Sequence, residues 1–146
     1  MKMKKIIITT FVFLLISTYS FAQDGILGTW YNTEKTGKVK IYKVGDKFFG
    51  ELVWLEEPND PDDGLPKRDK ENPDDKLAKK TLLGTVLLKD FKFDEDNVWE
   101  GGTIYDPENG KTYSCKMTLK DNNHLDVRGF IGFSLLGRTE NWTRAK

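Results

Sequence analysis

The chain has 146 residues, of which 38% are hydrophobic, and its 23 basic residues balance its 23 acidic ones. This length suits one domain, and the balanced charge excludes the clustered basic face that nucleic-acid binding demands. Because the chain contains a single cysteine, Cys115, it cannot form an internal disulfide bond. We expect one domain with no nucleic-acid partner, in which Cys115 is a small buried apolar residue.

The N-terminal segment has the pattern of a secretory signal peptide. Three lysines precede the apolar run 6–16, and small residues suited to a cleavage site end at Ala22. The run is too short for a membrane-spanning helix, which needs about 20 apolar residues. We expect residues 1–22 to be removed and residues 23–146 to be exported, to the periplasm or beyond it.

Short strands joined by tight turns are predicted along the remaining chain. Apolar and polar residues alternate in 37–44, 112–119 and 124–130, as in strands with one buried and one wet face. Segment 47–55 is apolar on both faces, and 137–144 provides the last strand. Turn residues such as Asp-Pro-Glu-Asn-Gly separate these runs at short intervals.

This spacing predicts an all-β fold, an antiparallel up-and-down meander of about eight strands. Two arrangements would hide the edge strands of such a meander, a closed barrel or a two-sheet sandwich. No crossover helices suited to a parallel sheet are evident in the sequence.

One segment, 56–80, interrupts the strand pattern with four of the chain's five prolines and many charged residues. Within it, Asn72 followed by Pro73 and two aspartates is a helix start. The asparagine side chain can cap free N–H groups, and proline suits the first helical position. We therefore expect a charged, proline-rich loop that contains a short helix at 73–80.

The aspartates of this loop also suggest calcium, because carboxylates are its preferred ligands. Their spacing argues against a site: an EF-hand loop with its glycine at Gly64 would place Pro61 and Lys70 at ligand positions. The sequence therefore predicts no metal site. The aspartates concerned are Asp60, Asp62, Asp63 and Asp69.

The stretch "VWEGGTIYDPENGKTYSC", residues 98–115, predicts a hairpin. Its turn is 106–110, where proline presets φ and Gly110 can take a left-handed conformation. Gly101 and Gly102 have two interpretations: they kink the strand at a barrel corner, which we favour, or they leave room for a ligand between Trp99 and Tyr113.

Catalytic residues are not predicted. His124 lies in a turn-like segment with no serine or cysteine nucleophile beside it in the sequence. A carboxylate pair could act as acid and base if two strands brought it together. Glu51, Glu100 and Asp106 are the first carboxylates to test for an enzyme, which is the third of three functional alternatives.

Several motifs resemble an exported bacterial family called domain of unknown function 2147. They are "LGTWYN", "GELVWLEEPND", "LLGTVLL", "WEGGTIYDPENGKTYSCKMTL" and "VRGFIGFSLLGRTENWTR". The resemblance covers essentially the whole chain after the leader, and it implies no particular activity. The chain also resembles lipocalins, which open with Gly-x-Trp and have a late arginine packed over that tryptophan. Here Gly28 and Trp30 match the first feature, and Arg138 or Arg144 could supply the second.

The first functional hypothesis is a lipocalin-like or calycin-like barrel that binds a small apolar or amphipathic ligand in the cell envelope, as a monomer without a cofactor. Such pockets are lined by aromatic residues with a few polar groups. Eight strands, however, leave a space that side chains alone can fill. The candidate ligand-binding residues are Trp54, Trp99, Tyr105, Tyr113 and Arg128.

The second hypothesis is an interaction module built on the apolar loop 129–137. Its large apolar residues are Phe130, Phe133, Leu135 and Leu136. They could dock on an envelope protein or a membrane. Alternatively, the loop folds over one end of the barrel and closes it, and we favour that interpretation.

Overall fold

The computed structural model describes residues 22–133 and 135–146. The predicted signal peptide, residues 1–22, lies outside the described residues apart from Ala22. Among the residues that are described, no helix has the length and apolar character needed to cross a bilayer.

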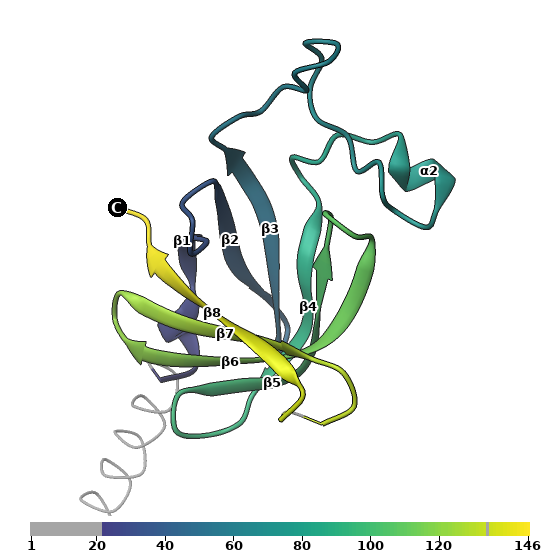
Figure 1. Ribbon diagram of the computed structural model, residues 1–146. Coiled ribbons are helices and arrows are strands. Elements are labelled where there is room, and N and C mark those ends of the chain that lie inside the picture. The colour runs from purple at the N-terminus through teal and green to yellow at the C-terminus, as the bar shows by residue number, and fades with distance from the viewer. Residues whose placement is uncertain (1–21, 134) are drawn as a thin grey trace, which may run out of the picture.

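Eight antiparallel strands of the described chain close into a barrel (Figure 1). Each strand pairs with the next, and β8 returns to β1, with Trp30 opposite Arg144. The prediction of an up-and-down barrel is confirmed, and the sandwich alternative is wrong because the β1–β8 pairing leaves no free edge. The strands are β1 (Gly28–Tyr31), β2 (Gly37–Val44), β3 (Lys47–Leu55), β4 (Val86–Phe93), β5 (Val98–Asp106), β6 (Lys111–Asp121), β7 (His124–Phe130) and β8 (Gly137–Arg144).

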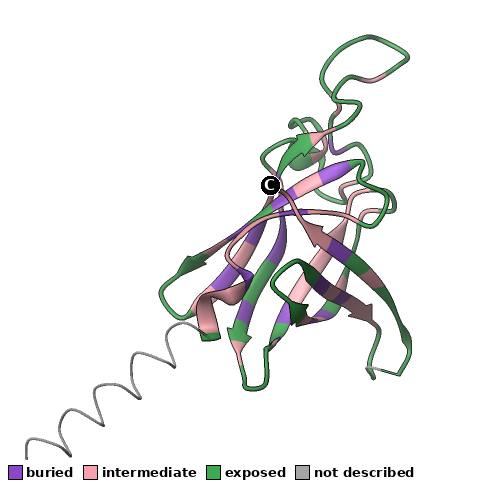
Figure 2. Ribbon diagram, turned by 90° about the vertical axis from the view of Figure 1, so that its left-hand side faces the viewer, coloured by how far each residue is buried: buried purple, intermediate pink, exposed green. Residues whose placement is uncertain are grey.

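Buried and exposed residues alternate along most strands (Figure 2). The inward-facing side chains form one continuous hydrophobic cluster, as the period of two predicts. Cys115 belongs to this cluster, as expected. The largest fully buried side chains are those of Trp30, Trp99, Phe48, Phe91, Ile26, Ile41, Leu88, Met117 and Leu125. Side chains therefore fill much of the barrel interior.

One end of the barrel is closed by the 3₁₀ helix η1 (Asp24–Ile26). Trp30 donates its indole N–H to the Ile26 carbonyl at 2.9 Å, and Trp99 donates to the Gln23 carbonyl at 3.2 Å. These two bonds join the buried aromatic core to the segment that covers it. We call this the closed end.

Arg144 lies at the same closed end, above Trp30. Its Cζ atom is 4.2 Å from the centre of the Trp30 ring, and its two terminal nitrogens donate to the carbonyls of Leu27 and Gly25, each at 2.7 Å. Arg138 is 82% exposed and lies elsewhere on β8. Of the two candidate arginines, Arg144 is the one over the tryptophan.

The long β3–β4 connection leaves the barrel at one end and carries the helix α2 (Asp75–Ala78) (Figure 1). The predicted helix is present but shorter than 73–80, and its cap is Asp74, which accepts from Lys76 N at 2.8 Å. The prediction of Asn72 as the cap was wrong. Asn72 Oδ1 instead accepts from Asp74 N at 2.9 Å, a local turn that holds the chain extended until Asp74.

This connection is mostly exposed, but Asp69 is not: it is 3% exposed. Its carboxylate accepts from the Tyr105 hydroxyl at 2.7 Å and from Asn72 Nδ2 at 2.8 Å. Burial and this hydrogen bond to Asp69 raise the pKa of Tyr105. Asp69 thus attaches the connection to the outside of β5, a contact that the sequence does not indicate.

Replacing Asp69 by alanine is expected to destabilise the protein by about 1–3 kcal/mol, because the Tyr105 hydroxyl and the Asn72 amide would lose their acceptor in a buried position. Denaturant unfolding would measure the change. Asp69→Asn is the matched control, since its amide oxygen can still accept one of the two bonds. Equal stability of the alanine variant and the native chain would contradict the anchoring role.

Candidate functional site

The end of the barrel opposite η1 carries the loops after β1, β3, β5 and β7, because strands of a meander alternate in direction. We call it the open end. Inward-facing positions near it are only half-buried, unlike the core below. They are Leu55, Ile104, Tyr113, Gly129 and Glu140. This half-exposed inner wall is the candidate functional site.

The register of the strands places these side chains on the inner wall. Tyr113 shares its face with buried Cys115 and Met117, and Ile104 is directly opposite Tyr113. Gly129 is opposite Cys115, and a Cβ added to it would lie 3.4 Å from Ile104. The glycine therefore keeps space open between β5, β6 and β7.

Glu140 is the acidic residue of this wall. It is opposite buried Val127, and its Oε2 atom accepts from the Trp142 indole N–H at 3.0 Å. The Arg138 guanidinium is 3.8 Å from Oε1. Sequence reasoning missed Glu140, although the alternation of "RTENW" with buried Trp142 could have placed it on the inner face.

Cys115 is buried in the barrel core and is not a reactive thiol. Burial raises the pKa of Cys115 to about 12, and the negative charge of Glu140 acts in the same direction. Since the thiolate is the nucleophilic form, the thiol is inert at neutral pH.

The five predicted ligand-binding residues do not come together. Tyr113 faces the interior near the open end, and its hydroxyl accepts from Asn109 Nδ2 at 2.9 Å. Trp99 is fully buried near the closed end, in contact with Phe48 and Phe93. Whether any of them touches a ligand stays a prediction.

The other three predicted residues have side chains on the outer side of the barrel wall, where Tyr105 is half-buried and packs against the hydrophobic cluster. Trp54 is opposite Lys38, whose Nζ is 4.8 Å from its ring. Tyr105 bonds to Asp69 of the β3–β4 connection. Arg128 donates to Thr139 Oγ1 at 2.9 Å.

Bulges explain why Trp54 and Tyr105 face outward. The pairing of β3 shifts between Leu52 and Trp54, and that of β5 shifts between Trp99 and Gly102. An extra residue reverses the alternation beyond it, because side chains change face at every position.

The Gly101–Gly102 pair belongs to the β5 bulge, and its surroundings favour the structural interpretation. Gly101 has φ +78° and faces open space, whereas a Cβ on Gly102 would lie 2.5 Å from the Phe91 ring. Phe91 therefore occupies the space next to Gly102, and the glycines do not line a ligand cavity.

The carboxylates considered for catalysis are separate. Glu51 is opposite Lys40 and Val86, Glu100 is exposed in the β5 bulge, and Asp106 accepts from Glu108 N within its own turn. Within the described residues, no three histidine, cysteine or acidic side chains are grouped as metal ligands.

His124 forms an exposed pair with Asp121. Its Nδ1 atom is 2.8 Å from the carboxylate. Hydrogen bonds from Asn123 N and then from His124 lower the pKa of Asp121. The contact closes the β6–β7 turn and brings no nucleophile to the histidine.

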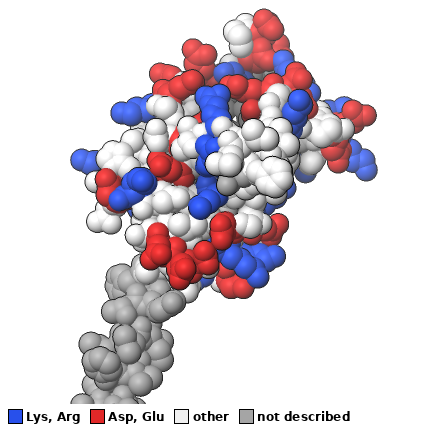
Figure 3. Space-filling model, turned by 60° about the horizontal axis from the view of Figure 1, so that its bottom comes forward, with Lys and Arg blue, Asp and Glu red and all other residues white. Residues whose placement is uncertain are grey.

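Two shallow hollows lie on the outside of the barrel. The first is formed where Leu135 lies beside Lys116 and Arg128 on the outer face of β6–β8. Figure 3 looks from below Figure 1, where β5–β8 lie, and shows a band of basic side chains next to an uncharged area.

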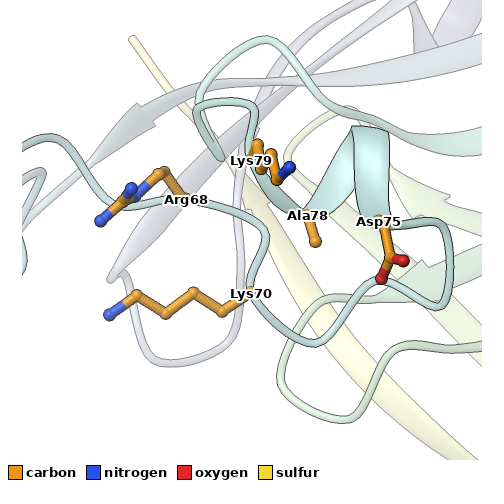
Figure 4. Close-up of a pocket in the computed structure, with 5 residues that line it drawn as sticks. All are labelled: Arg68, Lys70, Asp75, Ala78 and Lys79. Atoms are coloured by element: carbon orange, nitrogen blue, oxygen red, sulfur yellow. The ribbon is translucent and has the colours of Figure 1, made fainter.

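The second hollow is on the β3–β4 connection, beside α2 (Figure 4). Arg68 and Lys70 extend side by side away from the helix. Both already have acidic partners, since Arg68 is 3.2 Å from Asp63 and Lys70 forms a hydrogen bond with Asp60. That bond lowers the pKa of Asp60 and raises that of Lys70. The basic side chains at this hollow therefore belong to surface ion pairs, and their charges are already balanced by carboxylates.

Comparison with known proteins agrees with this fold. A search of curated proteins found no match. A solved structure of HP1028 from the human pathogen Helicobacter pylori, described as belonging to the lipocalin family, is similar at 25% identity and a TM-score of 0.71. The similarity covers 83% of this chain and 83% of that chain. The family model described as "Uncharacterized protein conserved in bacteria (DUF2147)" matches residues 28–144. The chain therefore belongs to the DUF2147 family, as its motifs predicted, and folds as a lipocalin-like barrel.

Proposed function

We propose that the protein binds a small amphipathic ligand at the open end of its barrel, after export to the cell envelope. The half-exposed inner wall carries this proposal. Leu55 and Ile104 offer apolar surface there, Tyr113 adds an aromatic ring, and Glu140 adds one charge. A few polar groups on an apolar concave wall are typical of small-molecule sites.

The packing of the interior limits the ligand. Below the wall, Trp30, Phe91 and Met117 are fully buried and occupy the middle of the barrel. The ligand must therefore be short and lie near the mouth. Glu140 pairs with Arg138 at 3.8 Å, and the register places Arg138 opposite Gly129 on the same wall, so the two side chains suit a ligand with a polar head group.

The lipocalin-like fold and the sequence of the leader support the two parts of the proposal. Barrels of this size enclose either side chains or one small ligand. The family itself is described as uncharacterised, so the ligand class comes from the inner wall of this chain. Export comes from the lysines and apolar run that precede Ala22.

Native mass spectrometry of the protein, gently purified from its own cell envelope, tests both parts. The expected chain begins at Gln23 and carries a discrete extra mass that is lost on denaturation. Gly129→Leu should abolish the extra mass, because the new side chain would grow toward Ile104 and Tyr113.

Ser114→Leu is the matched control, because it adds the same side chain to the outer face of the neighbouring strand, and it should retain the ligand. A native chain of ligand-free mass would contradict binding. A chain that still begins at Met1 would contradict export.

A further inference from the structure

The loop between β7 and β8 exposes an unusual amount of apolar surface. Ile131, Phe133, Leu135 and Leu136 are between 68% and 89% exposed. The expectation that this loop closes the barrel by burying them was wrong. Soluble monomers rarely present large contiguous apolar patches unless the patch has a binding role.

The loop backbone is hydrogen-bonded within the loop. Ile131 N donates to Leu136 O at 3.1 Å, Phe133 N to Ile131 O at 2.9 Å, and Leu136 N to Phe133 O at 3.0 Å. Gly132, at φ +71°, allows the tight turn. A compact loop of this kind can enter an apolar medium at lower cost, because these backbone groups already have partners.

Basic side chains flank the loop on the outer face of the barrel. Near the loop, the outward positions of β6 and β7 carry Lys116 and Arg128, against one carboxylate, Asp126. Asp126 accepts from Asn141 Nδ2 at 2.6 Å. Leu135 borders the same hollow as Lys116 and Arg128, so the apolar loop adjoins these two basic side chains.

The positive face is local. After Ala22 the chain has 20 basic and 23 acidic residues, so its net charge is negative. On this face, by contrast, basic side chains outnumber acidic ones. An apolar tip next to a basic face matches the layers of an anionic bilayer, with acyl chains below and phosphates above. A protein partner would need a matching apolar pocket, whereas a bilayer requires only this layering.

We propose that the β7–β8 loop inserts Phe133 and Leu135 into an anionic lipid bilayer while Lys116 and Arg128 face the lipid phosphates. The loop lies at the open end of the barrel, since it follows β7. Insertion therefore holds that end next to the membrane surface. The proposal concerns a surface separate from the inner wall and does not depend on ligand binding there.

Vesicle flotation with the chain from Gln23 onward tests this proposal, because that chain contains all eight strands of the closed barrel. The vesicles are phosphatidylethanolamine with phosphatidylglycerol. Phe133→Ser/Leu135→Ser should bind at least about a hundredfold more weakly, as each side chain leaving water contributes about tenfold or more.

Val44→Ser/Leu65→Ser is the matched control. It removes two apolar side chains that are also exposed, at 60% and 55%, and that belong to other segments of the chain, and it should bind like the native chain. Lys116→Gln/Arg128→Gln should weaken binding by about fivefold per basic side chain, and added salt should weaken it further.

Three outcomes would overturn the proposal. In the first, the loop variant floats with vesicles as the native chain does. In the second, binding is equal on uncharged phosphatidylcholine vesicles. In the third, the native chain ignores vesicles and forms a dimer that the loop variant does not form, which would assign the loop to self-association.

Discussion

Replacing Trp30 by alanine is expected to destabilise the protein by about 3–5 kcal/mol, the range for deleting a buried aromatic side chain. Trp30 is fully buried at the closed end, and it touches three parts of the structure. Its indole N–H bonds to Ile26 O, and Arg144 covers its ring. The deletion would leave a cavity, an unpaired carbonyl and an arginine without its aromatic partner.

Denaturant unfolding of Trp30→Ala, followed by circular dichroism, measures this loss. Trp54→Ala is the matched control, because Trp54 is 37% exposed on the outer face and should cost much less. Trp30→Phe retains a ring but removes the donor to Ile26 O, and should cost about 1–3 kcal/mol. Equal losses for Trp30→Ala and Trp54→Ala would show that the closed end does not dominate stability.

A double-mutant cycle between Trp30→Leu and Arg144→Leu separates packing from the cation–π contact. Arg144 also donates to Gly25 O and Leu27 O, so its removal alone combines several losses. The cycle is expected to give an interaction free energy of about 0.5–2 kcal/mol between the Trp30 ring and the Arg144 guanidinium. Trp30 and Arg144 connect the first strand, the last strand and η1, so their contact stabilises the closure of the barrel.

The sequence predicted the barrel because its signals are local. Alternation in 112–119, turn residues at 106–110 and the Gly-x-Trp segment each act within a few residues, and neighbouring strands pair in chain order. The helix was placed to within a turn for the same reason. Its cap was misplaced because Asn72 and Asp74 both suit a helix start, and Asn72 forms a local turn instead.

The candidate site was harder to predict, since one bulge reverses the side-chain alternation of a whole strand. Regular alternation from Leu52 would turn Trp54 inward, and from Trp99 it would turn Tyr105 inward. The bulges depend on pairing with partner strands, which no short window of sequence contains. The burial of Asp69 and the basic face of β6–β8 are likewise products of residues distant in the chain.

Substituting Gly102 measures how much the β5 bulge contributes to stability. In the folded barrel a Cβ on Gly102 would lie 2.5 Å from both the Lys89 carbonyl oxygen and the Phe91 ring. Gly102→Ala is therefore expected to destabilise the protein by about 1–3 kcal/mol or more, because a closely packed core cannot yield to an added methyl group. Unfolding in denaturant measures the change.

Gly101→Asn is the matched control for Gly102→Ala. Gly101 has φ +78° and no neighbour near its Cβ position, so only backbone strain opposes a side chain there, and asparagine tolerates that conformation. It should cost less than about 1 kcal/mol. If Gly101→Asn lost more stability than Gly102→Ala, the backbone conformation of the bulge would matter more than the space that Gly102 leaves for the Phe91 ring. A larger loss at Gly102 means that the barrel needs this glycine so that Phe91 can fill its interior, which confines any ligand to the mouth above.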